Sequence, residues 1–281
     1  MTTSARRLWE LFEPVHAVTY FSAEARQAAD GLGFRGFWMG YVAFRSAPLG
    51  PVDAPVVTAL FHGFAPRRVA RALPDAWDIA TPDAALTARR SAAGRALRRL
   101  LPEASVPEAA DALWDAASAA DTAGRALAAA NAALPAPDDP FERLWQATTT
   151  LREHRGDGHV AALVAADVSP VEAHLLKVAG GESPEDALRV GRDWTDDEWA
   201  DGVERLRRRG WTDGEGQLTA AGAAARREVE ERTDEAAAGP WRRLGEERTA
   251  AVVDLLRPLA RAVVDAGEVP YPNPIGLTPP A

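Results

Sequence analysis

The chain has 281 residues, a formal net charge of −9 and no cysteine, and its length suits one large domain or two ordinary ones. The lack of cysteine excludes disulfide bonds, thiolate zinc sites and a cysteine nucleophile. No apolar run is long enough to cross a membrane, and no apolar segment follows the basic N-terminus. We therefore expect neither a transmembrane helix nor a signal peptide, and we place the protein in the cytoplasm.

Helical patterns fill the first half of the chain. Residues 8–21 carry apolar side chains on one stripe, and residues 33–44 are apolar or aromatic on all sides, as in a buried helix. In chain order, the sequence predicts helices over residues 8–21, 22–30, 33–44, 53–64, 66–72, 82–101 and 107–134.

The proline-rich segment at residues 135–140 predicts a linker between two halves. Ser169 with Glu172 then forms the pattern of a capping box, which opens a helix. The dipeptide Asp213-Gly214 is typical of the turn of a short hairpin, here over residues 211–219. The predicted helices of this half cover residues 141–154, 158–166, 169–178, 183–190, 195–209, 220–237 and 240–266, followed by a proline-rich tail.

Short motifs of the first half recur in the second half, between 132 and 138 positions later. A tandem duplication usually packs as a pseudo-two-fold pair, which creates a seam between the copies. We therefore predict two related units in this chain. The matched pairs are Leu8-Trp9 with Leu144-Trp145, His16 with His154, Ala28–Asp30 with Ala165–Asp167, Trp77 with Trp211, and Leu86-Thr87 with Leu218-Thr219.

The second half resembles a winged helix-turn-helix of the MarR type. The stretch from Val203 to Trp211 matches the end of the recognition helix and the start of the wing, and Leu218 to Gly222 matches the return strand and the next helix. The resemblance covers residues 141–240. The whole chain is also similar to a family of actinobacterial helix-turn-helix proteins through phrases such as Phe61–Pro66 and Pro270–Pro274.

These observations predict a mainly α fold of tandem winged helix-turn-helix units, with a small β-wing in the second unit, forming an intramolecular pseudo-dimer. MarR-type regulators dimerise through long terminal helices, so the resemblance implies that residues 107–134 and 240–266 make the equivalent contact and that a monomer suffices. The expected divisions are a degenerate unit at 1–134, a linker at 135–140, a MarR-like unit at 141–268 and a tail at 269–281.

The charge of the predicted recognition helix in the second half argues against DNA as the partner. A recognition helix presents its N-terminal residues to base edges, and here those residues include Asp196, Asp197, Glu198 and Asp201. Carboxylates are repelled by the phosphates of DNA. Among the bases, only the amino group of cytosine forms a favourable contact with them. Sequence-specific DNA binding is therefore the alternative function rather than the leading one.

The densest polar cluster of the chain runs from Arg152 to His159 and was expected at the junction of two helices. Arg152, Arg155 and His159 would share a helix face and could clamp a carboxylate or phosphate. His154 and Asp157 belong to the same cluster. In MarR-type proteins small aromatic acids lodge near this position, so the resemblance implies the same place for a ligand. The alternatives are a structural network of ion pairs and, third, catalysis with His154 or His159 as the acid–base group.

Four residues outside that cluster complete the predicted ligand site: His16, Tyr20 and Trp38 facing it from the first half, together with His62. We predict no metal site, because the histidine spacing matches no metal-binding motif, and the sequence identifies no cofactor. The leading hypothesis is a protein that binds a small anionic or aromatic molecule between its halves. A DNA-binding regulator is the first alternative, and an enzyme recruited onto this scaffold is the second.

Overall fold

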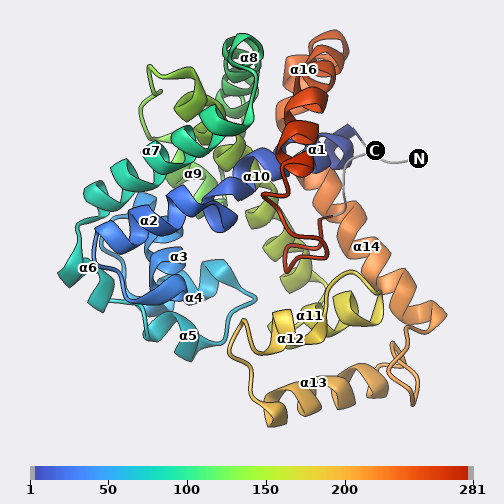
Figure 1. The fold of residues 1–281 in the computed structure, drawn as a ribbon. Helices are drawn as coiled ribbons and strands as arrows, with labels where there is room; N and C mark the ends of the chain where they lie inside the picture. Colours follow the sequence, from blue (N-terminus) through green and yellow to red (C-terminus); the bar gives the residue numbers. More distant parts are fainter. Residues whose placement is uncertain (1–3, 278–281) are drawn as a thin grey trace.

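The computed structural model describes residues 4–277, and helices form nearly all of its regular structure (Figure 1). The mainly α prediction is confirmed. Many helices begin at side chains that accept a backbone N–H of the first turn, which satisfies donors that have no partner inside the helix. These capping residues are Ser22, Thr81, Asp139, Ser169, Thr195 and Thr219.

The helices of the first half follow the predicted order. They are α1 (Ser4–Phe21), α2 (Ala23–Gly31), α3 (Gly36–Ser46), α4 (Ala54–Phe61), α5 (Pro66–Ala70), α6 (Asp75–Ile79), α7 (Pro82–Leu100), α8 (Val106–Ser118) and α9 (Ala126–Ala132), with short 3-10 turns η1 (Ala47–Leu49) and η2 (Glu103–Ser105).

The second half continues in the same manner. Its helices are α10 (Pro140–Ala165), α11 (Pro170–Ala179), α12 (Glu185–Arg189), α13 (Asp196–Arg208), α14 (Ala220–Ala237), α15 (Gly239–Leu244) and α16 (Glu246–Asp265). The capping boxes at Ser169 and Thr195 are both formed.

Helix α10 is the central element of the fold. It contains 26 residues without interruption, so the predicted break between residues 154 and 158 is wrong. The helix is buried over most of its length, and this packing outweighs the low helix propensity of Gly156 and Gly158. Gly158 also permits a close approach, because a Cβ there would lie 2.6 Å from Nη1 of Arg125.

Two predicted long helices are each divided in the structure. The segment at 107–134 separates into α8 and α9, with residues 119–125 between them. The segment at 240–266 separates into α15 and α16 at Gly245, whose φ of 85° lies in the left-handed region that favours glycine. Pro258 lies inside α16 without ending it.

The predicted hairpin at 211–219 is much reduced. Within the described residues it consists of one antiparallel bridge, between Thr212 and Leu218. The turn is held by the carboxylate of Asp213, which accepts the backbone N–H groups of Glu215 and Gln217 at 2.9 Å each. The predicted wing is therefore a loop stabilised by the carboxylate of Asp213 rather than by a ladder of strands.

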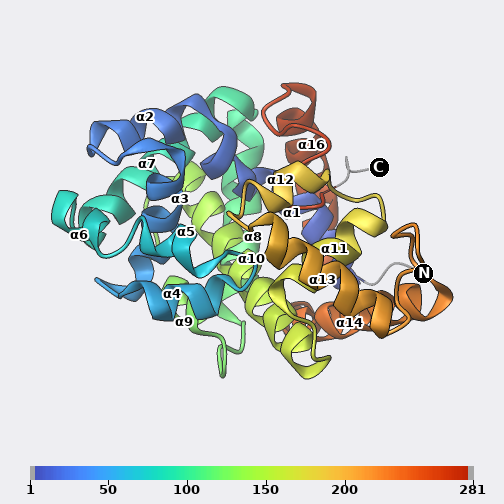
Figure 2. The same ribbon diagram turned by 90° about the horizontal axis from the view of Figure 1, so that it is seen from below.

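The main hydrophobic core joins the two halves. Leu8 and Phe12 of α1, Leu113 of α8, Leu144 of α10 and Leu256 of α16 belong to one buried cluster. A second cluster lies among α3 to α7, and a third lies among α10 to α14. Figure 2 shows the helices of these two smaller clusters on opposite sides of α10.

The described part of the tail, residues 269–277, crosses the surface close to α11 (Figure 1). Asn273 is buried and organises it: its side-chain oxygen accepts the backbone N–H groups of Ile275 and Leu277 at 3.1 Å each. Its carbonyl accepts the hydroxyl of Ser183 at 3.1 Å. Among the described residues, no helix is long and apolar enough to span a membrane.

Candidate functional site

A cavity of about 210 Å³ lies at the seam between the two halves. The first half contributes α3, α4 and the loop that follows α4. The second half contributes α10, α11 and Arg192, and the tail contributes Pro274 and Ile275. The described residues that line it include four cations, Arg45, Arg152, Lys177 and Arg192, and no Asp or Glu. Its remaining walls are rich in aromatic rings: Tyr20, Phe21, Phe37, Trp38, Tyr41, Phe61 and Phe64.

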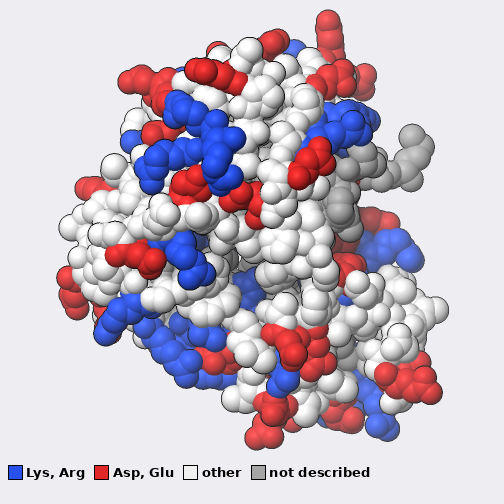
Figure 3. Space-filling view, viewed as in Figure 1, with Lys and Arg blue, Asp and Glu red and all other residues white. Residues whose placement is uncertain are grey.

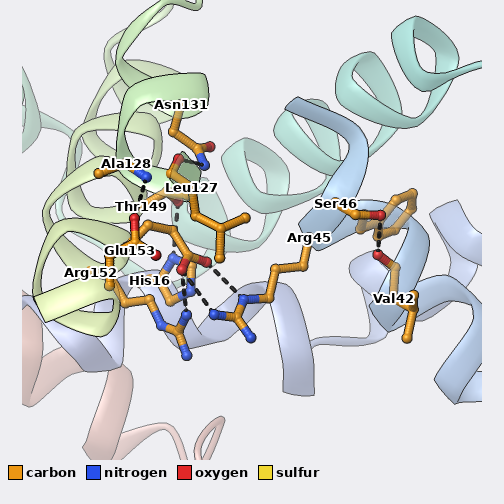
Figure 4. Close-up of polar contacts among 12 residues, drawn as sticks. His16, Val42, Arg45, Ser46, Leu127, Ala128, Asn131, Thr149, Arg152 and Glu153 are labelled. Carbon is orange, nitrogen blue, oxygen red and sulfur yellow. Dashed lines mark hydrogen bonds and ion pairs between the residues drawn. The ribbon is translucent and has the colours of Figure 1, made fainter. Parts of the chain in front are cut away.

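One side of the cavity is formed by a buried charge network that links α3 to α10 (Figure 4). Nε and Nη2 of Arg45 each donate to the carboxylate of Glu153 at 2.9 Å, and Nη1 of Arg152 donates to the same carboxylate at 2.8 Å. Burial would raise the pKa of Glu153, but Arg152 and Arg45 outweigh it and hold that pKa far below its ordinary value. One carboxylate thus serves two guanidinium groups.

A second buried carboxylate, Glu13, lies near this network. Glu13 is buried, its Oε2 accepts the indole N–H of Trp9 at 2.9 Å, and its Oε1 has no hydrogen-bond partner among the described residues. Its nearest contact with Arg152 is 3.8 Å. Burial raises the pKa of Glu13, against the opposing effect of Arg152. Glu13 is therefore a second buried acidic group beside Arg152.

Arg192 faces this network from the turn between α12 and α13. Its guanidinium carbon lies 4.0 Å from the ring centre of Phe64, and its Nε has no hydrogen-bond partner among the described residues. No carboxylate of the described residues lies within ion-pair distance of it. Burial alone would raise the pKa of Tyr41, but the charges of Arg45 and Arg192 lower it. The lack of a carboxylate beside Arg192 and the lowered pKa of Tyr41 both indicate that the cavity is positively charged.

Three histidines on the cavity wall are held in their neutral form. Burial lowers the pKa of His159 to about 3 and that of His174 to about 3, and it also lowers the pKa of His62. Nδ1 of His159 lies 2.9 Å from the hydroxyl of Thr233. Nε2 of His174 donates to the carbonyl of Gly63 at 2.7 Å, a contact that bridges the two halves.

A smaller cavity of about 100 Å³ adjoins the first and shares Tyr20, Tyr41 and Arg45 with it. His16 lines this cavity. Its ring nitrogens lie 2.9 Å from the hydroxyl of Thr149 and 2.9 Å from that of Tyr20. Burial and the charge of Arg152 keep the pKa of His16 well below its ordinary value. This smaller cavity therefore offers hydrogen-bonding groups beside aromatic walls.

The structure separates the predicted site residues into two groups. Arg152, His159, Tyr20, Trp38 and His62 line the larger cavity, and His16 lines the adjoining one. The other three predicted residues, His154, Arg155 and Asp157, do not line either cavity.

The uninterrupted course of α10 explains this separation. Residues 152, 156, 159, 160 and 163 share the face toward the cavity, as expected for a helix. Arg155 instead donates to Asp234 of α14 at 2.7 Å. Asp157 accepts the backbone N–H of Ala128 at 2.9 Å, at the start of α9. His154 lines a different surface groove beside Arg125.

The sequence alone did not assign Arg45, Arg192 or Lys177 to the site. It indicated Tyr41 only as part of the apolar and aromatic segment at residues 33–44. Arg45 carried one usable signal, because it ends an otherwise apolar and aromatic helix. Lys177 carried another, as the single lysine of the chain. Arg192 lies in a turn, and no periodicity indicated its direction. The described residues contain no group of three or more His, Cys, Asp or Glu side chains placed to hold a metal ion.

The outer face of α13 carries the acidic side chains that the sequence suggested. Asp196, Asp197, Asp201 and Glu204 are exposed, and Figure 3 shows negative side chains gathered along this lower edge of the molecule. The fourth predicted carboxylate, Glu198, instead pairs with Arg67 of α5, whose Nη1 donates to it at 2.9 Å.

The turn before α13 is also bound to the first half. Arg71 lies 2.9 Å from Asp193, and the backbone N–H of Ala65 donates to the carbonyl of Arg192 at 3.0 Å. The N-terminal end of α13 is thus attached to the first half through α5 and the loop before it.

Comparison with protein families identifies the lineage of the chain. A model described as a helix-turn-helix family matches residues 5–270, nearly the whole length, so the chain belongs to that family. Comparisons with curated proteins and with solved structures give no match. Helix-turn-helix units are a common framework for DNA recognition.

Proposed function

We propose that this member of the helix-turn-helix family binds a small aromatic anion in the cavity at its seam. The observation that carries the proposal is the composition of that cavity, which has three arginines, one lysine and no carboxylate among its described lining residues. Ligand pockets commonly combine apolar walls with a few polar anchors, and this cavity does so. A planar acid would meet aromatic faces and arginine donors at the same time.

Electrostatics favours an anion over a neutral guest of the same shape. Guanidinium groups bind carboxylate and phosphate through two parallel hydrogen bonds, and these contacts strengthen when water is excluded. Arg192 is the best anchor, because its Nε lacks a partner and its plane already lies near the ring of Phe64. Arg45 and Arg152 line the same cavity, but they already pair with Glu153, and Glu13 lies 3.8 Å from Arg152.

The test is a thermal-shift screen with small aromatic carboxylates and their neutral amides, repeated on Arg192→Met. We expect carboxylates to stabilise the protein more than amides. The substitution should weaken the affinity about tenfold or more, since it removes a charge-assisted contact. It leaves no buried carboxylate without its cation, because Arg192 forms no ion pair among the described residues.

Arg208→Met is the matched control, because Arg208 is exposed on α13 and does not line the cavity. Equal stabilisation by acids and amides, or equal affinity in both variants, would reject the anion site.

A second candidate function is DNA binding by α11, α12 and α13, and the observation that favours it is the family itself. In this alternative the helix-turn-helix unit follows the MarR-like winged pattern, although the outer face of α13 is acidic. A gel-shift experiment with genomic fragments at low salt tests it, and no retardation at micromolar protein would reject it.

We also infer that the two halves descend from one duplicated unit and pack as a pseudo-dimer. The recurring motif supports this inference, because Leu8-Trp9 and Leu144-Trp145 are the fifth and sixth residues of α1 (Ser4–Phe21) and α10 (Pro140–Ala165). The seam cavity would then lie between two copies of one ancestral unit, as ligand sites between subunits often do.

A further inference from the structure

We propose that Lys177 is a covalent capture site, whose amine forms an imine with an aldehyde group carried by an aromatic anion in the seam cavity. This inference rests on the proposed function, since it uses the same cavity. Lys177 is the only lysine in the chain, where every other basic side chain is arginine. It lines the cavity together with Arg45, Arg152 and Arg192.

The surroundings of Lys177 favour a reactive amine. Its Nζ donates to the carbonyl of Ile275 at 3.4 Å, a long contact, and no carboxylate of the described residues lies within ion-pair distance. Burial lowers the pKa of Lys177, and Glu230 and Glu182 oppose this effect only in part. A lysine in an apolar pocket among other cations is the environment in which amines become nucleophilic at neutral pH.

An arginine could not replace this group chemically, because a guanidinium remains protonated in proteins and does not condense with carbonyls. The step itself is balanced. The unprotonated amine of Lys177 attacks the carbonyl carbon of the aldehyde, and the carbinolamine then loses one water molecule to give the imine. No electrons are gained or lost. The three arginines would bind the acid group, and the aromatic walls would hold the ring.

The purely structural explanation is that lysine fits this position and arginine does not. Nζ lies 3.7 Å from the place that a Cβ on Gly276 would occupy, so the tail passes close to the end of the side chain. Under this explanation the amine would be protonated and unreactive, which the experiment below distinguishes directly.

The probe is 3-carboxybenzaldehyde, which carries the acid, the ring and the aldehyde. The protein is incubated with it at neutral pH, treated with borohydride and digested, and the modified amines are identified by mass spectrometry. The α-amino group of the chain is an internal standard. Its ordinary pKa is near 7.8 against about 10.4 for lysine, so an ordinary lysine would react less than this group. We expect Lys177 to react at least as fast as the α-amino group.

Three controls make the result specific. Lys177→Arg should lose the internal adduct while the α-amino adduct remains. Benzaldehyde, which lacks the acid, should label Lys177 at least tenfold less if the arginines position the probe. Arg192→Met should lower the yield at Lys177, and Arg208→Met should not.

Labelling of Lys177 slower than that of the α-amino group would overturn the inference, and so would equal labelling by benzaldehyde. The alcohol 3-(hydroxymethyl)benzoate separates this failure from that of the proposed function. If the alcohol stabilises wild type but not Arg192→Met while no imine is trapped, the anion site stands and the covalent step falls. If neither probe binds, both proposals fall.

Discussion

The two ends of α10 lie in contrasting surroundings. Toward its start, Phe141, Leu144 and Trp145 pack against apolar side chains of α1, α8 and α16. Toward its end, Arg152 and His159 face the seam cavity. Apolar side chains interdigitate to crystal-like density, whereas each buried guanidinium must keep its hydrogen bonds. One helix can therefore hold the two halves together by apolar packing near its start and line a cavity for a small molecule farther along its length.

The strongest test of this contrast removes one charge in the first turn of α10 and one near its middle. Glu153→Gln leaves Arg45 without a buried anion and leaves Arg152 with Glu13 alone, 3.8 Å away, and loss of one partner of a buried pair costs about 3–5 kcal/mol. Glu142→Gln removes the partner of Arg90, which lies 2.9 Å away in a part-exposed position, and should cost less than about 1 kcal/mol. Urea denaturation of both variants measures the difference. Equal costs would mean that the network around Glu153 is not a structural support of the cavity.

The next test removes hydrophobic volume instead of charge. Leu144 is fully buried in the main core, so Leu144→Ala should lower the free energy of unfolding by about 2–5 kcal/mol. Leu60 is half-buried and already lines the seam cavity, so Leu60→Ala should cost only about 1 kcal/mol. The same denaturation experiment compares them. A loss at Leu60 as large as that at Leu144 would show that the cavity wall is packed like the core.

The sequence predicted the helical class, the order of most helices and their capped starts, because these depend on local patterns. The capping box at Ser169 was predicted from Ser169 and Glu172, three positions apart, and it is formed. It also predicted that Arg152, His159, Tyr20, Trp38 and His62 belong to one place, and the structure brings all five to the same cavity. What these residues bind stays a prediction.

The errors arose where tertiary contacts decide. The glycines at 156 and 158 predicted a break, yet the packing around α10 keeps it helical. Arg155 and Asp157 lie on other faces of this helix, where α14 and α9 supply their partners. Arg192 could not be assigned, because the direction of a turn residue depends on how α12 and α13 dock against the first half. The division between α8 and α9, at residues 119–125, has no sequence signal comparable in strength to a capping box.

The smallest expected effect is a pH dependence confined to the cavity end of the molecule. The folded-state pKa of His174 is lowered to about 3 from its ordinary 6.5. A lowered pKa means that the unfolded chain binds the proton first, so stability is complete above about 6.5 and declines as the pH falls toward 3. The decline approaches ~1.4 kcal/mol per pH unit for each such histidine. The carboxylates titrate alike in the wild type and in a variant that changes only this histidine, so a comparison of the two isolates the contribution of His174.

We therefore expect His174→Gln to flatten the plot of unfolding free energy against pH over that range. The glutamine amide can still donate to the carbonyl of Gly63, so the bridge between the halves is kept while the titration is removed. His159 continues to titrate, so about half of the slope due to these two histidines should remain. Parallel curves for the variant and the wild type would mean that His174 is solvated, and a solvated His174 would imply that the seam is open to water at this end of α10.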